Sequence, residues 1–321
     1  MRADRDRLPW RLAGADPGPF GVLVSEVMLA QTQAGRVAER YPEFMERFPT
    51  PAALAGASLG EVLRVWQGLG YPRRAANLHR CAGAIVERHG GTVPADLPAL
   101  LALPGVGPYT ARAVLAFAFD EATMPVDTNI GRVLARFAGR SLGAKQVQSI
   151  GDDVLAETAA AGGSSGAVAL AYMDLGATVC RPKSPRCGDC PLLSGCIWGR
   201  ARLAAGEHGP TPDPARGSAR VSTTQARFEG SDRQGRGRLL RAAGDGPVSA
   251  DGLAAAAGWP ADPSRAARVA ATLVSDGLLT IDDAGSYVLG SGPAPAPTHP
   301  FLPTTDKRAS IVSPRSKRSP P

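Results

Sequence analysis

Four of the chain's five cysteines stand close together, at the spacing Cys180-x6-Cys187-x2-Cys190-x5-Cys196. Four thiolates within one short loop can enclose an iron–sulfur cluster. The alternatives are a zinc ion or free thiols, but four-cysteine zinc sites usually consist of two close pairs, and this loop contains only one. The spacing therefore favours a [4Fe–4S] cluster bound by these four residues.

Two carboxylates stand where they could take part in acid–base chemistry. Glu26 lies inside the apolar run 22–29, where burial would raise the pKa of its carboxyl group towards that of a useful acid. The alternative is an ordinary glutamate on a helix surface. Asp127 shortly precedes an expected helix at 130–137, and its alternative is an ordinary N-cap. The residues by themselves leave both alternatives open.

A glycine-containing turn lies between two expected helices, in the run Leu103-Pro104-Gly105-Val106-Gly107-Pro108-Tyr109-Thr110. Its two glycines permit a tight turn and would let DNA approach the main chain closely. Backbone amides at the start of the second helix could then hold a phosphate. We expect DNA contacts from the turn residues Gly105, Val106, Gly107 and Thr110.

Basic residues follow the first cysteine of the loop. Arg181, Lys183 and Arg186 could contact DNA phosphates, and a solvated surface is the alternative for these side chains. The whole chain of 321 residues carries a formal net charge of +7, which fits a polyanionic partner. The lone Cys81 stands on the apolar face of an expected helix, as a buried structural thiol would.

Helices must position these groups. From Gly21 to about Met173, apolar residues recur at helical spacing, and Gly or Pro interrupts the successive runs. This pattern predicts an all-α domain over residues 1–200, which ends in the cysteine loop at 180–196. A linker rich in Pro, Gly and Ala is expected at 201–226.

Residues 227–290 are expected to form a small α+β module. Three helices followed by a β-hairpin suggest a winged-helix fold, and their expected bounds are 237–243, 253–257, 266–273 and 278–289. The tail at 291–321 is rich in Pro, Ser, Lys and Arg and should be disordered. Its basic stretch, 307–318, could add nonspecific DNA affinity or be a solvated tail.

The bulk composition narrows the class of protein. The chain is 44% hydrophobic, which is enough for a sizeable core. No apolar run is long enough for a signal peptide or a membrane span. We therefore expect a cytoplasmic, nucleoid-associated protein that works as a monomer, without a membrane partner.

The hairpin and the cysteine loop together resemble the signatures of the helix-hairpin-helix DNA glycosylases, a superfamily that includes endonuclease III. Its bifunctional members place a lysine nucleophile two residues beyond the second hairpin glycine, and this chain has Tyr109 there. No lysine precedes Lys145. The resemblance therefore implies a monofunctional glycosylase, which releases a base and leaves an abasic site without lyase activity.

The run from Ser25 to Gln33 resembles the MutY motif SEVMLQQTQ, and similarity to the MutY adenine glycosylases extends from about Pro9 to Trp198. This resemblance implies excision of adenine mispaired with 8-oxoguanine or guanine in double-stranded DNA. Glu26 would protonate adenine, and Asp127 would stabilise the cationic sugar. The other implied roles are hydrogen-bonding support of these carboxylates by Tyr109 and Asn129, and wedging into the base stack by Gln31.

The chain departs from the MutY pattern at several positions. Ala30 replaces the first glutamine of the QQ pair, Pro72 stands where many MutY enzymes have a second tyrosine, and Gly131 occupies a position that is often basic. No segment resembles the Nudix-related domain that reads 8-oxoguanine. Residues 230–240 instead resemble the short C-terminal module of actinobacterial MutY-like proteins. These departures leave adenine excision as the expectation and weaken that of strong 8-oxoguanine discrimination.

Two other functions are compatible with the same fold. One is a monofunctional mismatch-thymine glycosylase of the superfamily, against which Glu26 in its MutY-like context argues. The other is a non-catalytic DNA-binding protein, against which the joint presence of Glu26, Asp127 and Tyr109 argues.

Overall fold

The computed structural model describes residues 8–11, 17–205, 212–219, 221 and 227–290. Within these residues the protein is helical apart from loops and one two-stranded antiparallel sheet, as the sequence predicted. None of the helices in this part of the chain combines the length and the apolar character that crossing a membrane requires. The tail expected over 291–321, with its basic stretch, lies outside the described residues.

The first half of the chain surrounds one hydrophobic core, with helix α2 (Gly18–Leu29) at its centre. This helix is apolar on nearly every side, and it is enclosed accordingly: Leu23 and Met28 have no exposed surface. It packs against α8 (Pro108–Ala118). The other helices of this half are η1 (Pro9–Arg11), α3 (Ala34–Arg47), α4 (Pro51–Gly56), α5 (Leu59–Val65), α6 (Arg73–His89) and α7 (Leu97–Leu101).

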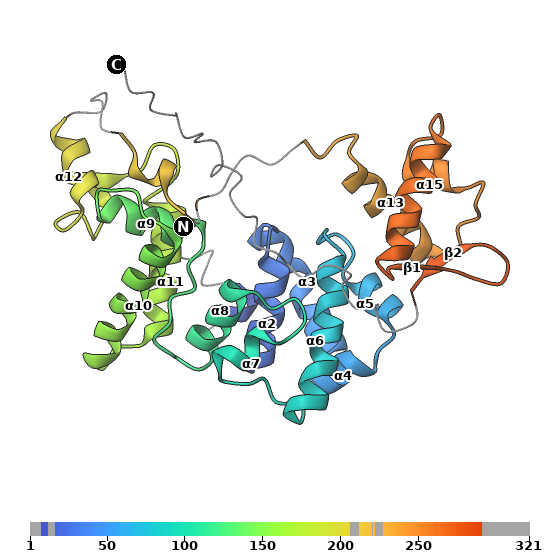
Figure 1. The fold of residues 1–321 in the computed structure, drawn as a ribbon, viewed down its shortest axis with the longest axis horizontal. Helices are drawn as coiled ribbons and strands as arrows, with labels where there is room; N and C mark the ends of the chain where they lie inside the picture. The colour runs from blue at the N-terminus through green and yellow to red at the C-terminus, as the bar shows by residue number, and fades with distance from the viewer. Residues whose placement is uncertain (1–7, 12–16, 206–211, 220, 222–226, 291–321) are drawn as a thin grey trace, which may run out of the picture.

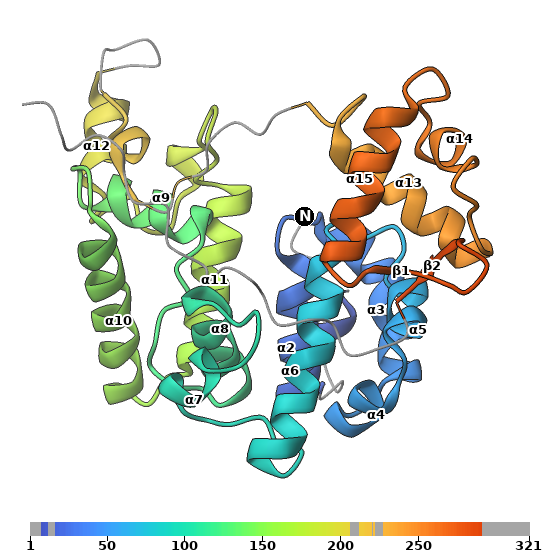
Figure 2. The same ribbon diagram turned by 45° about the vertical axis from the view of Figure 1, so that its right-hand side comes forward.

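The second part of the glycosylase-like core has a hydrophobic cluster of its own, which includes Met124, Ile130 and Leu155. Its helices are joined to the first half by contacts between α11 and α8. Figure 2 shows the two parts side by side, with α8 between them. The helices of this second part are α9 (Thr128–Phe137), α10 (Ala144–Ala160), α11 (Ser165–Thr178) and α12 (Ile197–Ala204).

The C-terminal module consists of three helices followed by a β-hairpin, the order that its sequence pattern predicted. In the hairpin, Leu279 pairs with Leu289 and Ile281 with Tyr287. The first helix begins earlier than the expected 237, because the polar run from Asp232 continues the same helix. The elements are α13 (Asp232–Asp245), α14 (Leu253–Ala257), α15 (Pro263–Ser275), β1 (Leu279–Ile281) and β2 (Tyr287–Leu289).

The module is packed onto the first half of the core and is not a separate arm (Figure 1). Its buried Leu239 and Leu273 belong to the same hydrophobic cluster as α2 and α6, and both α13 and β2 contact α5. Asp276 pairs with Arg73 at the start of α6. The module therefore packs on the core. Its sequence also allows DNA binding as a winged helix, which this packing does not exclude and which stays a prediction.

The linker expected over 201–226 is structured where it is described. Helix α12 continues through Ala204, and residues 212–219, here called the return segment, fold back against α9. Ala215 of this segment is 2% exposed. The Pro- and Gly-rich composition of these residues predicted a flexible linker. Composition does not show which hydrogen-bond partners a segment has elsewhere in the chain, and such partners hold the return segment in place.

Candidate active site and cysteine loop

Glu26 lies near the end of α2, with 6% of its surface exposed. Burial raises the pKa of its carboxyl group from 4.5 to about 7, although the hydrogen bond from Tyr109 and the charge of Arg11 act in the opposite direction. The negative charge of Asp127 raises it further. The side chain can therefore carry a proton near neutral pH and give it up, which is what a general acid must do.

Tyr109 supports this carboxyl group directly. It is the second residue of α8, and its hydroxyl donates a hydrogen bond of 2.9 Å to Oε2 of Glu26. Burial, together with the negative charges of Glu26 and Asp127, raises the pKa of the Tyr109 hydroxyl well above its usual value. The phenol therefore stays a neutral donor. It holds one oxygen of Glu26 and leaves the other available.

The hairpin that precedes α8 requires glycine at position 105 but not at position 107, where φ is −93° and an added Cβ would meet no atom within 4 Å. Gly105 adopts a φ of 77°, and a Cβ there would lie 2.6 Å from the Cβ of Asn77, so both conformation and space demand glycine. The amide of Val106 donates to Leu103 within the turn, and the Val106 side chain is buried. Within the described residues, no hydrogen bond occupies the amides of Gly107 and Thr110, which remain available at the helix N-terminus.

Asp127 is the N-cap of α9, and hydrogen bonds orient both of its oxygens. Oδ1 accepts from the backbone amides of Asn129 (2.9 Å) and Ile130 (2.7 Å), and Oδ2 accepts from the Asn129 side chain (2.7 Å). Burial raises the pKa of Asp127 above 3.8, while these hydrogen bonds oppose the rise. The alternative to a functional role for Asp127 was an ordinary N-cap, and the structure shows that Asp127 does cap α9. Capping does not prevent the same carboxylate from having a further function.

A buried arginine joins the Asp127 region to the cysteine loop. Arg132, which is 4% exposed, donates to Oδ1 of Asn129 (2.8 Å) and to the carbonyl oxygens of Gly176 (2.6 Å) and Cys180 (2.7 Å). Gly176 allows α11 to approach α9 closely, since a Cβ there would lie 2.6 Å from the Cβ of Asn129. The orientation of Asn129 therefore depends on contacts that extend to the first cysteine.

The four clustered cysteines are partly buried, and none forms a disulfide. They line one cavity together with Val179, Leu193 and Trp198. Yet among the residues that the structure describes, no three His, Cys, Asp or Glu side chains are arranged to hold a single metal ion. The four sulfur-bearing side chains thus line a common cavity, and the preference for a polynuclear cluster over one zinc ion rests on their spacing along the sequence.

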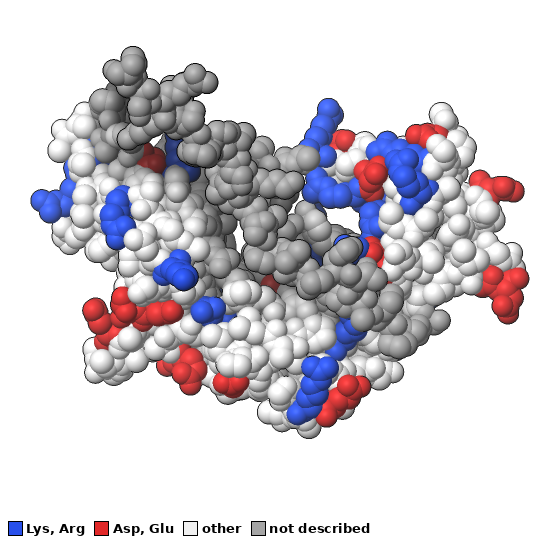
Figure 3. Space-filling view, in the orientation of Figure 1, with Lys and Arg blue, Asp and Glu red and all other residues white. Residues whose placement is uncertain are grey.

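The other residues expected to contact DNA are exposed. Gln31, in the loop after α2, has a left-handed backbone with a φ of 64°, a conformation that is uncommon for a non-glycine residue and often marks a functional position. Lys183 is exposed, Arg181 donates to the Ser184 carbonyl, and Arg186 pairs with Asp189 at 3.6 Å. Figure 3 shows Lys and Arg dispersed over one face of the described residues, without one continuous basic patch.

Glu26 also lines a cavity of about 790 Å³, whose walls come from η1, α2, α11 and the cysteine loop. Trp10, Arg11 and Asp174 lie on these walls, and Arg11 pairs with Asp174 at 3.2 Å. Sequence reasoning assigned none of the three a role. They come from segments far apart in the chain, and no spacing rule connects them. Arg132 was missed too, although its place on the buried face of α9 marks it as an unusual cation.

The comparison with protein families matches residues 24–153 to the HhH-GPD superfamily of base excision DNA repair proteins, the class that the helical fold and the hairpin define. The adenine DNA glycosylase of Mycobacterium tuberculosis is 44% identical over 298 residues, which are 90% of each chain. The chain therefore belongs to the adenine DNA glycosylase family within this superfamily.

Solved structures with the same fold cover somewhat less of the chain. A thermostable thymine-DNA glycosylase is 29% identical and has a TM-score of 0.55, over 62% of this chain and 91% of its own. An endonuclease III in a non-covalent complex with DNA is 26% identical, with a TM-score of 0.51 over 59% of this chain and 88% of its own. These similarities confirm the predicted helix-hairpin-helix glycosylase fold.

Proposed function

We propose that this protein hydrolyses the N-glycosidic bond of adenine mispaired with 8-oxoguanine or guanine in duplex DNA and leaves an abasic site. The observation that carries the proposal is a buried carboxyl group, Glu26, with a pKa of about 7, which lines a cavity and is held by Tyr109. The 44% identity to an adenine DNA glycosylase over 90% of the chain supports the choice of base.

In this proposal Glu26 is the acid. Adenine leaves poorly as an anion, so a proton must reach the base as the glycosidic bond breaks. Tyr109 donates to Oε2 of Glu26, which leaves Oε1 to carry the transferable proton. Arg11, whose charge acts on Glu26 from the cavity wall, favours return of the carboxyl group to its ionised form after the transfer.

Asp127 stabilises the positive charge that develops on the sugar. Its carboxylate is fixed by the amides at the start of α9 and by Asn129, so it needs no rearrangement when the charge appears. The negative charge of Asp127 raises the pKa of Glu26 and so favours the proton on Glu26. The hydrogen bonds from Ile130 and Asn129 favour the ionised form of Asp127, and this is the division of roles that a two-carboxylate mechanism uses.

The product should be an abasic site without strand cleavage by the enzyme. A lyase step usually needs an amine to form a Schiff base with the sugar, and residue 109 is a tyrosine. Lys145 and Lys183, the lysines in the described residues, do not line the cavity that contains Glu26. Among the described residues, therefore, no lysine lies at the proposed site for this step.

The remaining elements support binding of DNA and of a cofactor. Cys180, Cys187, Cys190 and Cys196 would hold a [4Fe–4S] cluster, which supplies a structural centre for the loop. The amides of the hairpin would hold a phosphate of duplex DNA, and Gln31 would enter the base stack. The exposed Arg181, Lys183 and Arg186 would add phosphate contacts.

The test is to incubate the purified holoprotein with duplexes that carry A·8-oxoguanine, A·G, T·G or A·T, followed by alkali to split abasic sites. Alkali-dependent cleavage of the adenine strand is expected, and Glu26→Gln and Asp127→Asn should each abolish most of it. The exposed Glu39 and Asp153 provide matched controls, Glu39→Gln and Asp153→Asn, which should retain activity.

Each other outcome changes the assignment. Cleavage of T·G alone would favour the mismatch-thymine glycosylase, whose fold is similar. Binding without cleavage of any duplex would favour a non-catalytic DNA-binding protein. The ratio of turnover on A·8-oxoguanine to that on A·G measures how far the protein discriminates between the two opposite bases.

A further inference from the structure

Arg136 is a fully buried cation beside the cysteine loop, on the face of α9 that contacts α12 and the return segment. It is 1% exposed, and its guanidinium group donates to Sγ of Cys180 (3.4 Å) and to the carbonyl oxygen of Arg181 (2.8 Å). The ring of Trp198 lies 4.5 Å from the guanidinium carbon. A buried arginine requires compensation for its charge, and a stacked ring supplies only part of it.

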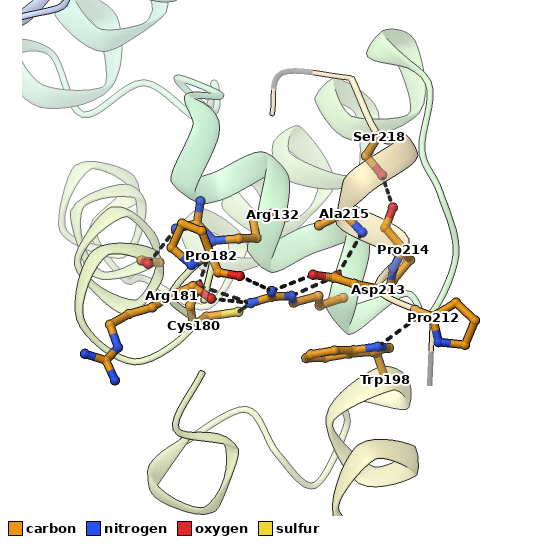
Figure 4. Close-up of polar contacts among 12 residues, drawn as sticks. Arg132, Cys180, Arg181, Pro182, Trp198, Pro212, Asp213, Pro214, Ala215 and Ser218 are labelled. Atoms are coloured by element: carbon orange, nitrogen blue, oxygen red, sulfur yellow. Dashed lines mark hydrogen bonds and ion pairs between the residues drawn. The ribbon is translucent and has the colours of Figure 1, made fainter. Parts of the chain in front are cut away.

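The compensating charge comes from outside the cysteine loop. Asp213 of the return segment accepts two hydrogen bonds from Arg136, from Nε to Oδ1 (3.0 Å) and from Nη2 to Oδ2 (2.7 Å). Burial pushes the pKa of Asp213 up, but the hydrogen bonds and charge of Arg136 hold it below its usual value. Figure 4 shows Cys180, Arg181 and Pro182 on one side of the guanidinium group and Asp213 on the other.

Further contacts attach the return segment to the same surface. Trp198, the residue stacked on Arg136, donates from Nε1 to the carbonyl oxygen of Pro212 (3.0 Å). The Ser218 hydroxyl accepts from the amide of Leu142 (3.0 Å), in the loop between α9 and α10. Asp213 therefore occupies a defined position and is not a loosely attached counter-ion.

The arrangement gives one cation two anionic partners of different kinds. A cysteine that ligates iron is a thiolate, and Arg136 donates to the sulfur atom of Cys180 while Asp213 draws the same guanidinium group in the other direction. Hydrogen bonds to ligand sulfur atoms and nearby charges are the means by which a protein tunes such a cluster. Removing the carboxylate charge would leave the charge of Arg136 uncompensated at this sulfur.

We propose that Asp213 is a positioning residue for the iron–sulfur site, which through Arg136 fixes the Cys180 ligand and sets the charge that this ligand experiences. The inference rests on the proposed cluster. It extends the site to a carboxylate beyond the cysteine loop, in a segment whose composition alone predicted a linker.

The test uses the cluster-loaded full chain and three variants. Asp213→Asn removes the charge but keeps an acceptor oxygen for Arg136. Ser218→Ala weakens the attachment of the return segment without touching Arg136. Asp153→Asn makes the same chemical change as the first variant at an exposed position on α10, outside the cysteine loop. The readouts are the reduction potential of the cluster by film voltammetry and the rate of iron release to a chelator.

Asp213→Asn should shift the potential to a more positive value, because an uncompensated cation favours the more negative cluster. It should also release iron faster, on the order of tenfold, as loss of an outer-sphere partner does in metal sites. Ser218→Ala and Asp153→Asn should leave the potential unchanged.

Two results obtained with the cluster-loaded proteins would overturn the inference. One is a potential and an iron-release rate for Asp213→Asn that match those of the wild type. The other is an equal shift of the potential in Ser218→Ala, which would assign the effect to attachment of the segment and not to the carboxylate. A wild-type protein that binds no iron and sulfide would overturn the proposed cofactor, and this inference with it. None of these readouts measures adenine excision. Failure of the proposed glycosylase activity can therefore be distinguished from failure of this inference.

Discussion

The first hydrophobic core and the cysteine-loop region each contain a carboxyl group shielded from solvent, but the pKa values of these two groups are shifted in opposite directions. Glu26 is enclosed by apolar residues and a neutral phenol, and burial raises its pKa to about 7. Asp213 is partly buried, with 16% of its side chain exposed, and a paired guanidinium group keeps its pKa below the usual value. The difference shows that burial alone does not define a carboxyl group's role. A carboxyl group without a paired cation can be an acid, whereas one with a paired cation is a fixed charge.

The largest difference between Glu26 and Asp213 is expected in the catalytic rates of their variants. Glu26→Gln removes the proposed acid and should lower the single-turnover rate on A·8-oxoguanine by roughly 10²–10⁴-fold, the range for loss of a general acid. Asp213→Asn, compared at equal cluster content, should lose far less. Similar losses in both variants would show that the contrast between acid and fixed charge is wrong.

Removal of the cation should have the largest effect on stability. Arg136→Met leaves Asp213 without its partner and should lower the free energy of unfolding by about 3 kcal/mol, as breaking one side of a buried ion pair does. The measurement is chemical denaturation of the cluster-loaded protein. Arg140→Met, a change at an exposed position nearby, is the control and should be close to neutral.

The free energy of unfolding should depend on pH because Glu26 ionises. Its pKa is raised from 4.5 to about 7, so folding favours the neutral form. The wild type should therefore lose stability relative to Glu26→Gln as the pH rises from about 4.5 through 7, by about 3 kcal/mol in total, with no difference in this contribution below that range. Denaturation at pH 5 and pH 8.5 measures it, and parallel pH profiles would contradict it.

The close approach of α11 to α9 can be tested at Gly176. Gly176→Ala would place a methyl group 2.6 Å from the Cβ of Asn129, so the helices must separate, at a cost of about 1–3 kcal/mol. Because Asn129 orients Asp127, the variant should also lose activity. Gly83→Ala, at a helical glycine with open space around it, is the control. A fully active and fully stable Gly176→Ala protein would show that this approach is not needed.

The smallest effect is expected from the Tyr109 hydroxyl. Its hydrogen bond lowers the pKa of Glu26, so Tyr109→Phe should raise that pKa and move the alkaline limb of the pH–rate profile to higher pH. The maximal rate should change less than in Glu26→Gln. A limb that does not move, or that moves to lower pH, would show that this hydroxyl does not act on the acid.

The sequence predicted those parts of the site that depend on spacing within one segment. The cysteine loop, the glycine turn at 103–110 and the carboxylate inside an apolar helix are local patterns, and each has a physical reason that can be read along the chain. The helical fold followed from the same periodicity. Helix α13 began earlier than expected, since its first turns are polar and carry no apolar repeat.

The contacts between distant segments could not be predicted in this way. Arg11 meets Asp174, and Arg136 meets Asp213, only because helices from different parts of the chain pack together. A buried arginine has no periodic signature that separates it from one on a surface. The return segment was taken for a linker because its composition is that of a flexible chain, whereas its position depends on a few specific hydrogen bonds.

The order of residues along the chain has a consequence for biosynthesis. Asp213 is translated after Cys196, so in a growing polypeptide all four cysteines leave the ribosome before the segment that packs beside them. A cysteine loop that has just left the ribosome is therefore not yet closed by the pairing of Asp213 with Arg136. If the proposed cluster is inserted at that stage, its slow release of iron would be a property acquired only when translation has passed Asp213.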